Sequence, residues 1–380
     1  MREIIKLNEI SPLVGDVFKN DYKLTDVAAS PVGIMVRSFN MHEYVPAESV
    51  LCVGRAGAGT NNIPVDKYAE KGVVVFNTPG ANANAVKELV VLSLFLCARK
   101  VAQGINWASG LTDGEKTVAE QVEKGKKAFG GNEIAGKTLG VYGLGAIGKK
   151  VAFAAQALGM KIIGYDPYLP ESARADFAGM TIVGDKETLF TESDYITFHV
   201  PLTPETKGLV NESTIALMKD GVRVINCARG ELVDNEAMIS ATASGKVAAY
   251  VTDFPNAAIV GKTGIICIPH LGASTEEAED NCAVMAARQM VDYIENGNIV
   301  NSVNFPSVKA ERSTARTLVL SSADAQAVVS KLVLKANATV TANVKKNYGA
   351  MLIDTDAPLD GELIAAIEKT DGVIKVRSFC

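Results

Sequence analysis

The sequence predicts an α/β protein built on parallel β-sheets and followed by a small α+β domain. Up to residue 268, short β-branched runs alternate with alanine-rich helical segments, which is the rhythm of βαβ units with buried parallel strands. A glycine-rich turn beginning at Gly143 joins one such strand to a helix. Beyond Pro306 the predicted order changes to βαββαβ, which is typical of a small α+β fold.

The length and composition indicate a folded protein of several domains. The chain has 380 residues, of which 48% are hydrophobic and 21% are charged, and its formal net charge is −5. At roughly 100–200 residues per domain, this length predicts two or three domains. The composition excludes disordered and fibrous classes. The slightly acidic balance gives no attraction for nucleic acid or an anionic membrane, so we expect a small-molecule ligand.

Neither the start of the chain nor its cysteines point to export. The first ten residues lack the apolar core of a secretory signal, and the longest apolar run, residues 90–98, is about half the length that spans a bilayer. The six cysteines show no close pair at metal-ligand spacing and no dense disulfide framework. We therefore expect a cytoplasmic protein with reduced cysteines and no metal.

Nine strands and two long helices are expected in the parallel part of the chain. The strands are predicted at residues 33–36, 50–53, 73–76, 139–142, 161–165, 195–198, 223–226, 249–252 and 265–268. Helices are predicted over 85–103 and 276–294, and a polar, glycine-rich stretch over 110–131 reads as a connector between two lobes. Because the second helix is expected to return to the first lobe, we predict one lobe from residues 1–100 and 283–306 and another from 101–282.

The last part of the chain is expected to form a separate unit over residues 312–380. Strands are predicted at 318–320, 339–344, 350–354 and 373–376, with helices at 325–335 and 362–368. Residues 309–316 are expected to be its linker.

A dinucleotide-binding pattern begins at Gly143. Gly143 permits a tight turn, Gly145 lets the backbone approach a pyrophosphate, and Gly148 allows the helix to pack close to the strand. The phosphates are expected at the helix N-terminus. Asp166 ends the next strand, where an acid accepts hydrogen bonds from ribose hydroxyls and repels a 2′-phosphate. The pattern predicts NAD rather than NADP.

Two residues at strand ends suit acid–base chemistry on a carboxylic acid. Arg229 follows the strand at 223–226, and a guanidinium there can hold a carboxylate with two hydrogen bonds. His270 follows the strand at 265–268 and is the natural general base. Of the other two histidines, His199 has apolar neighbours and is expected to be packed or beside the cofactor, and His42 lies in a polar loop.

These motifs, in this order, resemble the D-isomer-specific 2-hydroxyacid dehydrogenases. The resemblance covers nearly the whole chain and rests on the blocks at residues 33–38, 53–59, 76–80, 143–148, 164–167, 226–230 and 269–275. It implies two doubly wound, Rossmann-like lobes, with the active site in the cleft between them and NAD as cofactor. It also implies a homodimer or homotetramer.

The resemblance assigns roles to individual residues. It implies that Arg229 and His270 are catalytic. The residues expected to bind the substrate acid are Arg55 and Arg229, together with the backbone of Ser38, Gly57 and Ala58. The residues expected to line the NAD site are Thr78, Gly143, Gly145, Ala146, Ile147, Gly148, Asp166, Val200, Cys227, Ala228, Arg229, Asp253, His270, Gly272 and Ala273.

The final domain resembles an ACT domain, which in this family can bind an amino-acid effector. Its first strand–helix loop, residues 321–325, lacks the Asn-x-Pro-Gly type of turn that family members use near an effector. Effector binding and a role in assembly therefore both remain open.

The sequence departs from the family at the acid that normally pairs with the catalytic histidine. That acid is a glutamate in a Glu-Pro pair, but no Asp or Glu occurs between Asp253 and Glu276. Either Asp253 or a carboxylate from elsewhere replaces the relay glutamate, or His270 works without an acidic partner.

The resemblance implies a specific reaction. We expect NAD-dependent oxidation of D-3-phosphoglycerate to 3-phosphohydroxypyruvate, the first step of phosphorylated L-serine biosynthesis. The alternatives are another D-2-hydroxyacid, such as glycerate with hydroxypyruvate, and a non-catalytic NAD-binding scaffold.

Overall fold

The computed structural model describes residues 1–334 and 336–379 and divides the chain into two compact units. Unit 1 comprises Met1–Asn82 with Glu276–Cys380, and unit 2 comprises Ala83–Thr275. The boundaries therefore fall after residues 82 and 275, rather than after 100 and 282 as predicted. Lys335, the expected end of a helix, and Cys380 lie outside the described residues.

Unit 1 contains a five-stranded parallel sheet. Its strands run in the order β2-β1-β3-β4-β5, and their bounds are β1 (Arg2–Lys6), β2 (Tyr22–Thr25), β3 (Gly33–Val36), β4 (Cys52–Arg55) and β5 (Val74–Phe76). The helices of this part are α1 (Val14–Phe18), α2 (Val65–Glu70) and the long α11 (Glu276–Asn296). All three predicted strands are confirmed within two residues, because they are continuous apolar runs.

The strand β1 was not predicted from the sequence. Its residues alternate between charged and apolar types, and only Ile4 and Ile5 are buried. The strand order reverses at β1. After β1 the chain adds β2 on one side, and it then adds β3, β4 and β5 on the other side. The carboxyl ends of β1 and β3 therefore flank a topological switch point, where open parallel sheets bind ligands.

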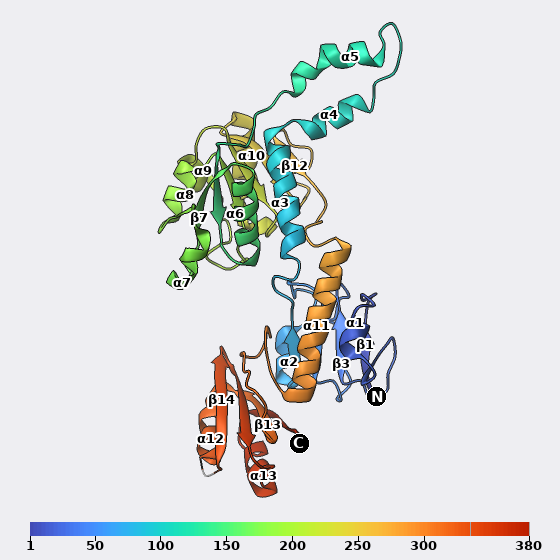
Figure 1. The fold of residues 1–380 in the computed structure, drawn as a ribbon, viewed down its shortest axis with the longest axis vertical. Coiled ribbons are helices and arrows are strands. Elements are labelled where there is room, and N and C mark those ends of the chain that lie inside the picture. Colours follow the sequence, from blue (N-terminus) through green and yellow to red (C-terminus); the bar gives the residue numbers. More distant parts are fainter. Residues whose placement is uncertain (335, 380) are drawn as a thin grey trace. The chain divides into compact units, whose positions relative to one another are not determined.

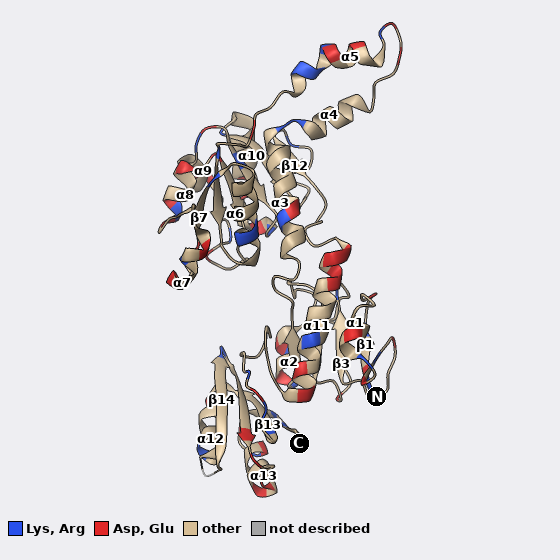
Figure 2. Cartoon of the chain, in the orientation of Figure 1, with Lys and Arg blue, Asp and Glu red and all other residues tan. Residues whose placement is uncertain are grey.

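Helix α11 packs closely on the sheet of unit 1. A Cβ at Gly54 would lie 2.4 Å from the Met290 sulfur, so glycine lets the methionine of α11 reach the backbone of β4. Acidic residues fill the first turn of α11 (Figure 2), where they suit the positive end of the helix dipole.

Unit 2 contains a seven-stranded parallel sheet in the order β12-β11-β10-β9-β6-β7-β8. The strands are β6 (Thr138–Tyr142), β7 (Lys161–Tyr165), β8 (Thr181–Ile182), β9 (Tyr195–Phe198), β10 (Val222–Asn226), β11 (Val247–Thr252) and β12 (Ile265–Cys267). Two apolar clusters cover its faces: one includes residues of α3 (Ala83–Ala98) and α6 (Ala146–Ala157), the other residues of α8 (Lys186–Glu192), α9 (Glu212–Leu217) and α10 (Asn235–Ser244). The topological switch lies between β6 and β9.

The predicted helix over 85–103 is two helices, and the predicted connector is part of unit 2. Helix α3 ends at Ala98 because its inner face, including Val90 and Leu94, packs on the sheet only to that point. The chain then forms α4 (Val101–Ala108), α5 (Val118–Gly125) and a short 3-10 helix, which extend away from the sheet (Figure 1) and contain no buried residue. These helices touch through Trp107 and Phe129, whose ring centroids are 5.1 Å apart.

The end of the chain forms the predicted βαββαβ order. Its antiparallel sheet runs β14-β15-β13-β16, and its elements are β13 (Ala315–Ser322), α12 (Ala323–Val333), β14 (Ala338–Lys345), β15 (Tyr348–Thr355), α13 (Gly361–Glu368) and β16 (Val373–Phe379). One face of the sheet is packed with residues of α12 and α13. The other face contributes Leu318 and Leu352 to the same core as α11, so this domain belongs to unit 1.

Arginines fasten this domain to the last turn of α11. Arg316 is 1% exposed, holds the Asp354 carboxylate at 2.7 and 2.8 Å, and donates to the carbonyl oxygen of Asn296 at 2.8 Å. Arg377 donates to the carbonyl oxygens of Tyr293 and Ile294. These cations satisfy carbonyl groups that a helix end leaves without an intrahelical partner.

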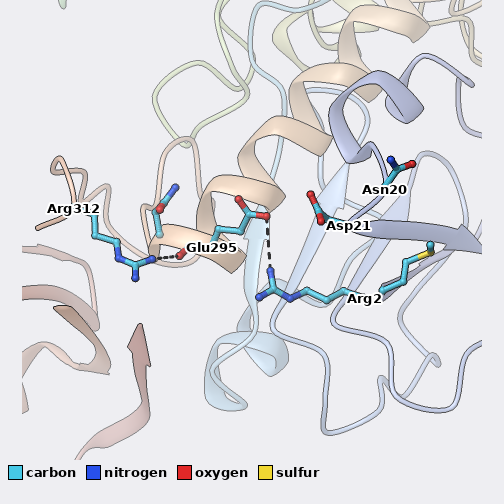
Figure 3. A pocket seen from close by; sticks show the side chains of 7 residues that line it. Arg2, Asn20, Asp21, Glu295 and Arg312 are labelled. Atoms are coloured by element: carbon cyan, nitrogen blue, oxygen red, sulfur yellow. Dashed lines mark hydrogen bonds and ion pairs between the residues drawn. The ribbon is translucent and has the colours of Figure 1, made fainter. Parts of the chain in front are cut away.

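A pocket of about 600 Å³ lies beside the same turn (Figure 3), lined in part by Arg2, Glu295 and Arg312. Arg2 begins β1, so this pocket is at the amino end of that strand. Among the described residues, no helix is long and apolar enough to cross a membrane.

Candidate active site

In the glycine turn of unit 2, the surroundings of a Cβ atom differ at each of the three glycines. Gly143 has φ +94°, and a Cβ there would lie 2.7 Å from the carbonyl oxygen of His199. A Cβ at Gly148 would lie 1.9 Å from the carbonyl oxygen of Gly143, so glycine is required for α6 to approach β6. A Cβ at Gly145 would meet no atom within 4 Å. The backbone at Gly145, Ala146 and Ile147 therefore borders open space at the N-terminus of α6.

The acid predicted to select NAD lies against this turn. Asp166 follows β7, and its carboxylate accepts hydrogen bonds from the backbone N–H groups of Leu144 and Tyr168, both at 2.9 Å. These bonds fix the side chain beside the glycine turn. Each carboxylate oxygen has a further lone pair, which can accept from a ribose hydroxyl.

The ends of β9 and β10 supply neutral groups. His199 follows β9, and its Nε2 lies 3.1 Å from the Thr197 hydroxyl. Burial lowers the pKa of His199 to about 3, so it is uncharged at neutral pH and is not a base for catalysis. Cys227 follows β10, and burial raises the pKa of its thiol to about 12. Val200 follows His199 and is partly exposed.

The Asn226 side chain fixes the backbone of Arg229, whereas the Arg229 side chain is exposed. Asn226, the last residue of β10, donates from its side chain to the carbonyl oxygen of Arg229 at 2.8 Å. The same side chain accepts from the N–H of Ala228 at 3.2 Å. This double contact fixes the turn, while the guanidinium itself donates to the carbonyl oxygen of Ala228 at 2.6 Å.

His270 follows β12, and its ring lies against an aromatic side chain rather than an acid. The ring centroids of His270 and Phe254 are 4.7 Å apart, with the planes inclined by 47°. In the described part of the chain, no hydrogen bond joins the imidazole to a carboxylate. An apolar ring thus lies beside His270, and no acid follows Asp253 in the sequence before Glu276.

Asp253 is the buried carboxylate at the centre of this sheet edge. It follows β11, which lies between β10 and β12, so its neighbours in the sheet carry Arg229 and His270. Asp253 has no exposed surface, and neither carboxylate oxygen has a hydrogen-bond partner within the described residues. Burial raises its pKa, although the nearby His270, the backbone at Gly272 and the charge of Arg229 act in the opposite direction. The three groups are therefore close enough to influence one another.

The backbone of the loop after His270 lies close to the Asp253 carboxylate. A Cβ at Gly272 would lie 3.3 Å from an oxygen of Asp253, so the absence of a side chain lets the loop backbone approach the carboxylate. Gly272 is buried, and Ala273 is partly exposed.

Unit 1 contains four of the predicted substrate-binding residues, Ser38, Arg55, Gly57 and Ala58, which lie at or after the carboxyl ends of β3 and β4. Arg55 ends β4, and its guanidinium folds back over Gly57, where a Cβ would lie 1.9 Å from Nη1. Gly57 accepts a backbone hydrogen bond from Thr78 at 3.1 Å, and Ala58 accepts one from the side chain of Asn77. Ser38 is exposed in the loop after β3.

The structure adds a second cation that the sequence analysis did not single out. Arg37 follows β3 and pairs with Glu279 of α11 at 2.5 Å. The charges of Arg55 and Arg37 both lower the pKa of the Cys282 thiol, although burial raises it more. Arg37 therefore lies at the same edge as Arg55. Its place directly after a buried strand was the available sequence signal.

Known proteins match this chain in sequence. Residues 101–272 match the family described as "D-isomer specific 2-hydroxyacid dehydrogenase, NAD binding domain". D-3-phosphoglycerate dehydrogenase of Methanocaldococcus jannaschii is 38% identical over 272 residues, which are 70% of this chain and 50% of that protein. The human protein of the same name is 38% identical over 264 residues, which are 68% of this chain and 47% of that protein.

The chain belongs to the D-isomer-specific 2-hydroxyacid dehydrogenase family. Its NAD-binding domain is the part matched at residues 101–272. The chain spans about half the length of these curated relatives.

Solved structures of D-2-hydroxyacid dehydrogenases share the fold. An NAD⁺-bound 3-phosphoglycerate dehydrogenase from Entamoeba histolytica has a TM-score of 0.62 and 27% sequence identity, covering 80% of this chain and 98% of that one. A glyoxylate reductase has a TM-score of 0.64 at 24% identity, covering 80% of this chain and 98% of that one.

The residues present fit NAD. The open space beside Gly145 leaves room for a pyrophosphate at a helix N-terminus, and Asp166 offers acceptors beside it. The buried acceptors of Asp253 suit a carboxamide, which carries two N–H donors.

Proposed function

We propose that the protein oxidises D-3-phosphoglycerate to 3-phosphohydroxypyruvate with NAD. The observation that supports this most is the order of strand ends in unit 2. Arg229, Asp253 and His270 follow three adjacent strands, and the glycine turn follows another strand of the same parallel sheet. An arginine and a histidine thus lie at the same sheet edge as the glycine turn, which supports their proposed roles in binding a carboxylate and accepting a proton.

His270 is the proposed general base. It accepts the proton of the substrate's C2 hydroxyl as the C2 hydrogen leaves as a hydride with its electron pair, so that C2 becomes a carbonyl carbon. NAD⁺ supplies the hydride acceptor when bound. The exposed imidazole is accessible to a substrate.

Arg229 is proposed to hold the substrate carboxylate and to polarise the forming carbonyl. Its guanidinium presents donors in a planar fork that matches a carboxylate. Because charge on the C2 oxygen increases as its proton leaves, a fixed cation beside it stabilises the transition state more than the bound alcohol.

Asp253 is proposed to contribute to the nicotinamide site and to the charge balance around His270. It lies within electrostatic reach of both cations without a hydrogen bond to His270 among the described residues. This arrangement favours a relay weaker than the family's glutamate, in which Asp253 acts through its charge.

The residues of unit 1 are proposed to bind the anionic ends of the substrate. Arg55 and Arg37 place two cations at one sheet edge. Ser38, Gly57, Ala58 and Thr78 keep the predicted roles at substrate and NAD. A phosphorylated acid carries more negative charge than glycerate or lactate and gains more from a pair of arginines.

The predictions about assembly and location remain proposals. These are a homodimer or homotetramer, a cytoplasmic location, and a final domain of the ACT type that binds an amino-acid effector or contributes to assembly.

NADH formation tests the proposed function. We expect the protein to reduce NAD⁺ at alkaline pH with D-3-phosphoglycerate, and to do so with higher kcat/KM than with D-glycerate or D-lactate. Preference for D-glycerate would move the assignment to the alternative substrate. Absence of NADH with all three acids would contradict a dehydrogenase and favour the scaffold.

A further inference from the structure

The Asn8 side chain is at the centre of a hydrogen-bond cluster at the switch point of unit 1. Strand β1 ends at Lys6, and the carboxamide oxygen of Asn8 accepts from three consecutive backbone N–H groups after β3. The donors are Arg37 at 3.1 Å, Ser38 at 3.1 Å and Phe39 at 2.9 Å. One side chain thus determines the course of the loop that carries Ser38.

The Asn62 side chain binds the carbonyl groups of the same loop. Its side-chain nitrogen donates to the carbonyl oxygen of Phe39 at 2.8 Å and to that of Arg37 at 3.3 Å. Two side-chain carboxamides that are distant in sequence therefore bind this loop: Asn8 accepts from its N–H groups, and Asn62 donates to its carbonyl groups. Few apolar contacts hold it, since Ser38 is exposed and Phe39 is 40% exposed.

The Ser38 backbone N–H is occupied by this contact. Three converging N–H groups form a cradle of the kind that binds anions, but here the Asn8 oxygen fills it. The polar group left to a ligand at Ser38 is its hydroxyl, which lies 3.5 Å from the Asn8 nitrogen.

We propose that Asn8 is a positioning residue for substrate binding, which holds the Arg37–Phe39 loop so that Ser38 and Arg37 face an anionic substrate. The inference rests on the proposed function. It also explains why a neutral amide suits this place. A carboxylate would accept the same three hydrogen bonds, but it would add a second negative charge to the one that Glu279 already brings to Arg37, where an anion is to bind.

Steady-state kinetics of Asn8→Ala test the proposal. Loss of the acceptor frees the loop, so we expect KM for D-3-phosphoglycerate to rise about 10-fold, while kcat and KM for NAD⁺ stay within about 3-fold. Asn62→Ala is expected to change KM in the same direction. The control is Asn20→Ala, because Asn20 precedes β2 at the opposite edge of the sheet and its side chain makes no hydrogen bond within the described residues.

Asn8→Asp separates positioning from a general effect on folding. It keeps the acceptor, so its melting temperature should match that of the parent. Its KM should be raised at low salt and return toward the parent value near 0.5 M salt, where charge effects between exposed groups are screened. The KM of Asn8→Ala should not recover with salt.

Three results would overturn the inference. The first is an unchanged or lower KM in Asn8→Ala. The second is a parallel loss of kcat, NAD⁺ binding and melting temperature in both Asn8 variants, which would indicate a structural role alone. The third is a parent protein that oxidises none of the three acids, which contradicts the proposed function as well; the first two results leave that function standing.

Discussion

At the scale of the residue, Asp253 shows how burial and charge compete. Its carboxylate is fully buried without a hydrogen-bond partner in the described part of the chain, yet His270 and Arg229 lie close enough to lower its pKa in part. The net direction is upward, so Asp253 keeps its proton to a higher pH in the folded protein than in the unfolded chain.

Stability should therefore depend on pH through Asp253. Because its pKa is higher in the folded than in the unfolded chain, this group's stabilising contribution is present below its ordinary value of 3.8 and is lost as pH rises through the raised value. In Asp253→Asn that loss is absent. Between acidic and neutral pH, we expect the unfolding free energy of the variant to rise relative to that of the parent. Urea unfolding at several pH values measures this.

The activity of the same variant tests the relay. If Asp253 supports His270 by its charge, Asp253→Asn should change both turnover and the pH profile of NADH formation. Unchanged turnover with an unchanged profile would eliminate Asp253 as the substitute for the missing glutamate.

Single residues also show where sequence reasoning ends. Arg229 and His270 were predicted because each follows an apolar strand, which is a local signal. Asn8 was not, because its three contacts lie 29 to 31 residues away and depend on β1 lying beside β3. Similarly, only the structure shows Phe254 against the ring of His270.

At the scale of the element, the glycine turn and α6 form one unit whose glycines have separable roles. A side chain at Gly148 meets a backbone oxygen, which cannot move without displacing β6. A side chain at Gly145 projects into open space.

Two alanine variants should separate folding from nucleotide binding. Gly148→Ala is expected to cost about 2 kcal/mol or more of unfolding free energy and to weaken NAD⁺ binding. Gly145→Ala should keep the parent's melting temperature but bind NAD⁺ at least 10-fold more weakly, because its methyl group occupies the space left for the pyrophosphate. Thermal unfolding and calorimetric titration give both values. Equal melting temperatures for the two variants would contradict this account.

Elements were predicted best where most of their residues are apolar and buried. Strands β3, β7 and β9 have the predicted bounds, and the βαββαβ order of the last domain is confirmed. Strand β1 was missed because its charged residues break the pattern. The end of α3 was misplaced because its apolar pattern continues into α4, whose apolar side chains contact no core.

At the scale of the whole molecule, the last domain is held to α11 by buried charge. Within the described residues, Arg316 makes two hydrogen bonds to the Asp354 carboxylate. It makes four more, to the Asn298 side chain and to the carbonyl oxygens of Asn296, Ala310 and Glu311. These contacts make the domain part of unit 1, rather than a separate unit on the linker predicted at 309–316.

Removing that arginine should destabilise unit 1. Arg316→Ala leaves the Asp354 carboxylate buried without its partner, which costs about 3–5 kcal/mol. The matched control is Arg312→Ala, because within the described residues Arg312 makes one hydrogen bond, to the carbonyl oxygen of Glu295. Its loss is expected to cost less than about 1 kcal/mol. Denaturant unfolding compares them. Similar losses in the two variants would show that the contacts of Arg316 with Asn296 and Asn298 do not hold the domain to α11.

The central claim is that His270 acts as the base in an NAD-dependent oxidation of a phosphorylated 2-hydroxyacid. The most direct measurement is NADH formation from D-3-phosphoglycerate by the parent and by His270→Asn, with NAD⁺ affinity determined for both. We expect kcat to fall about 10²- to 10⁴-fold in the variant, with NAD⁺ affinity within about 3-fold of the parent. An active parent whose turnover survives this substitution would contradict the claim.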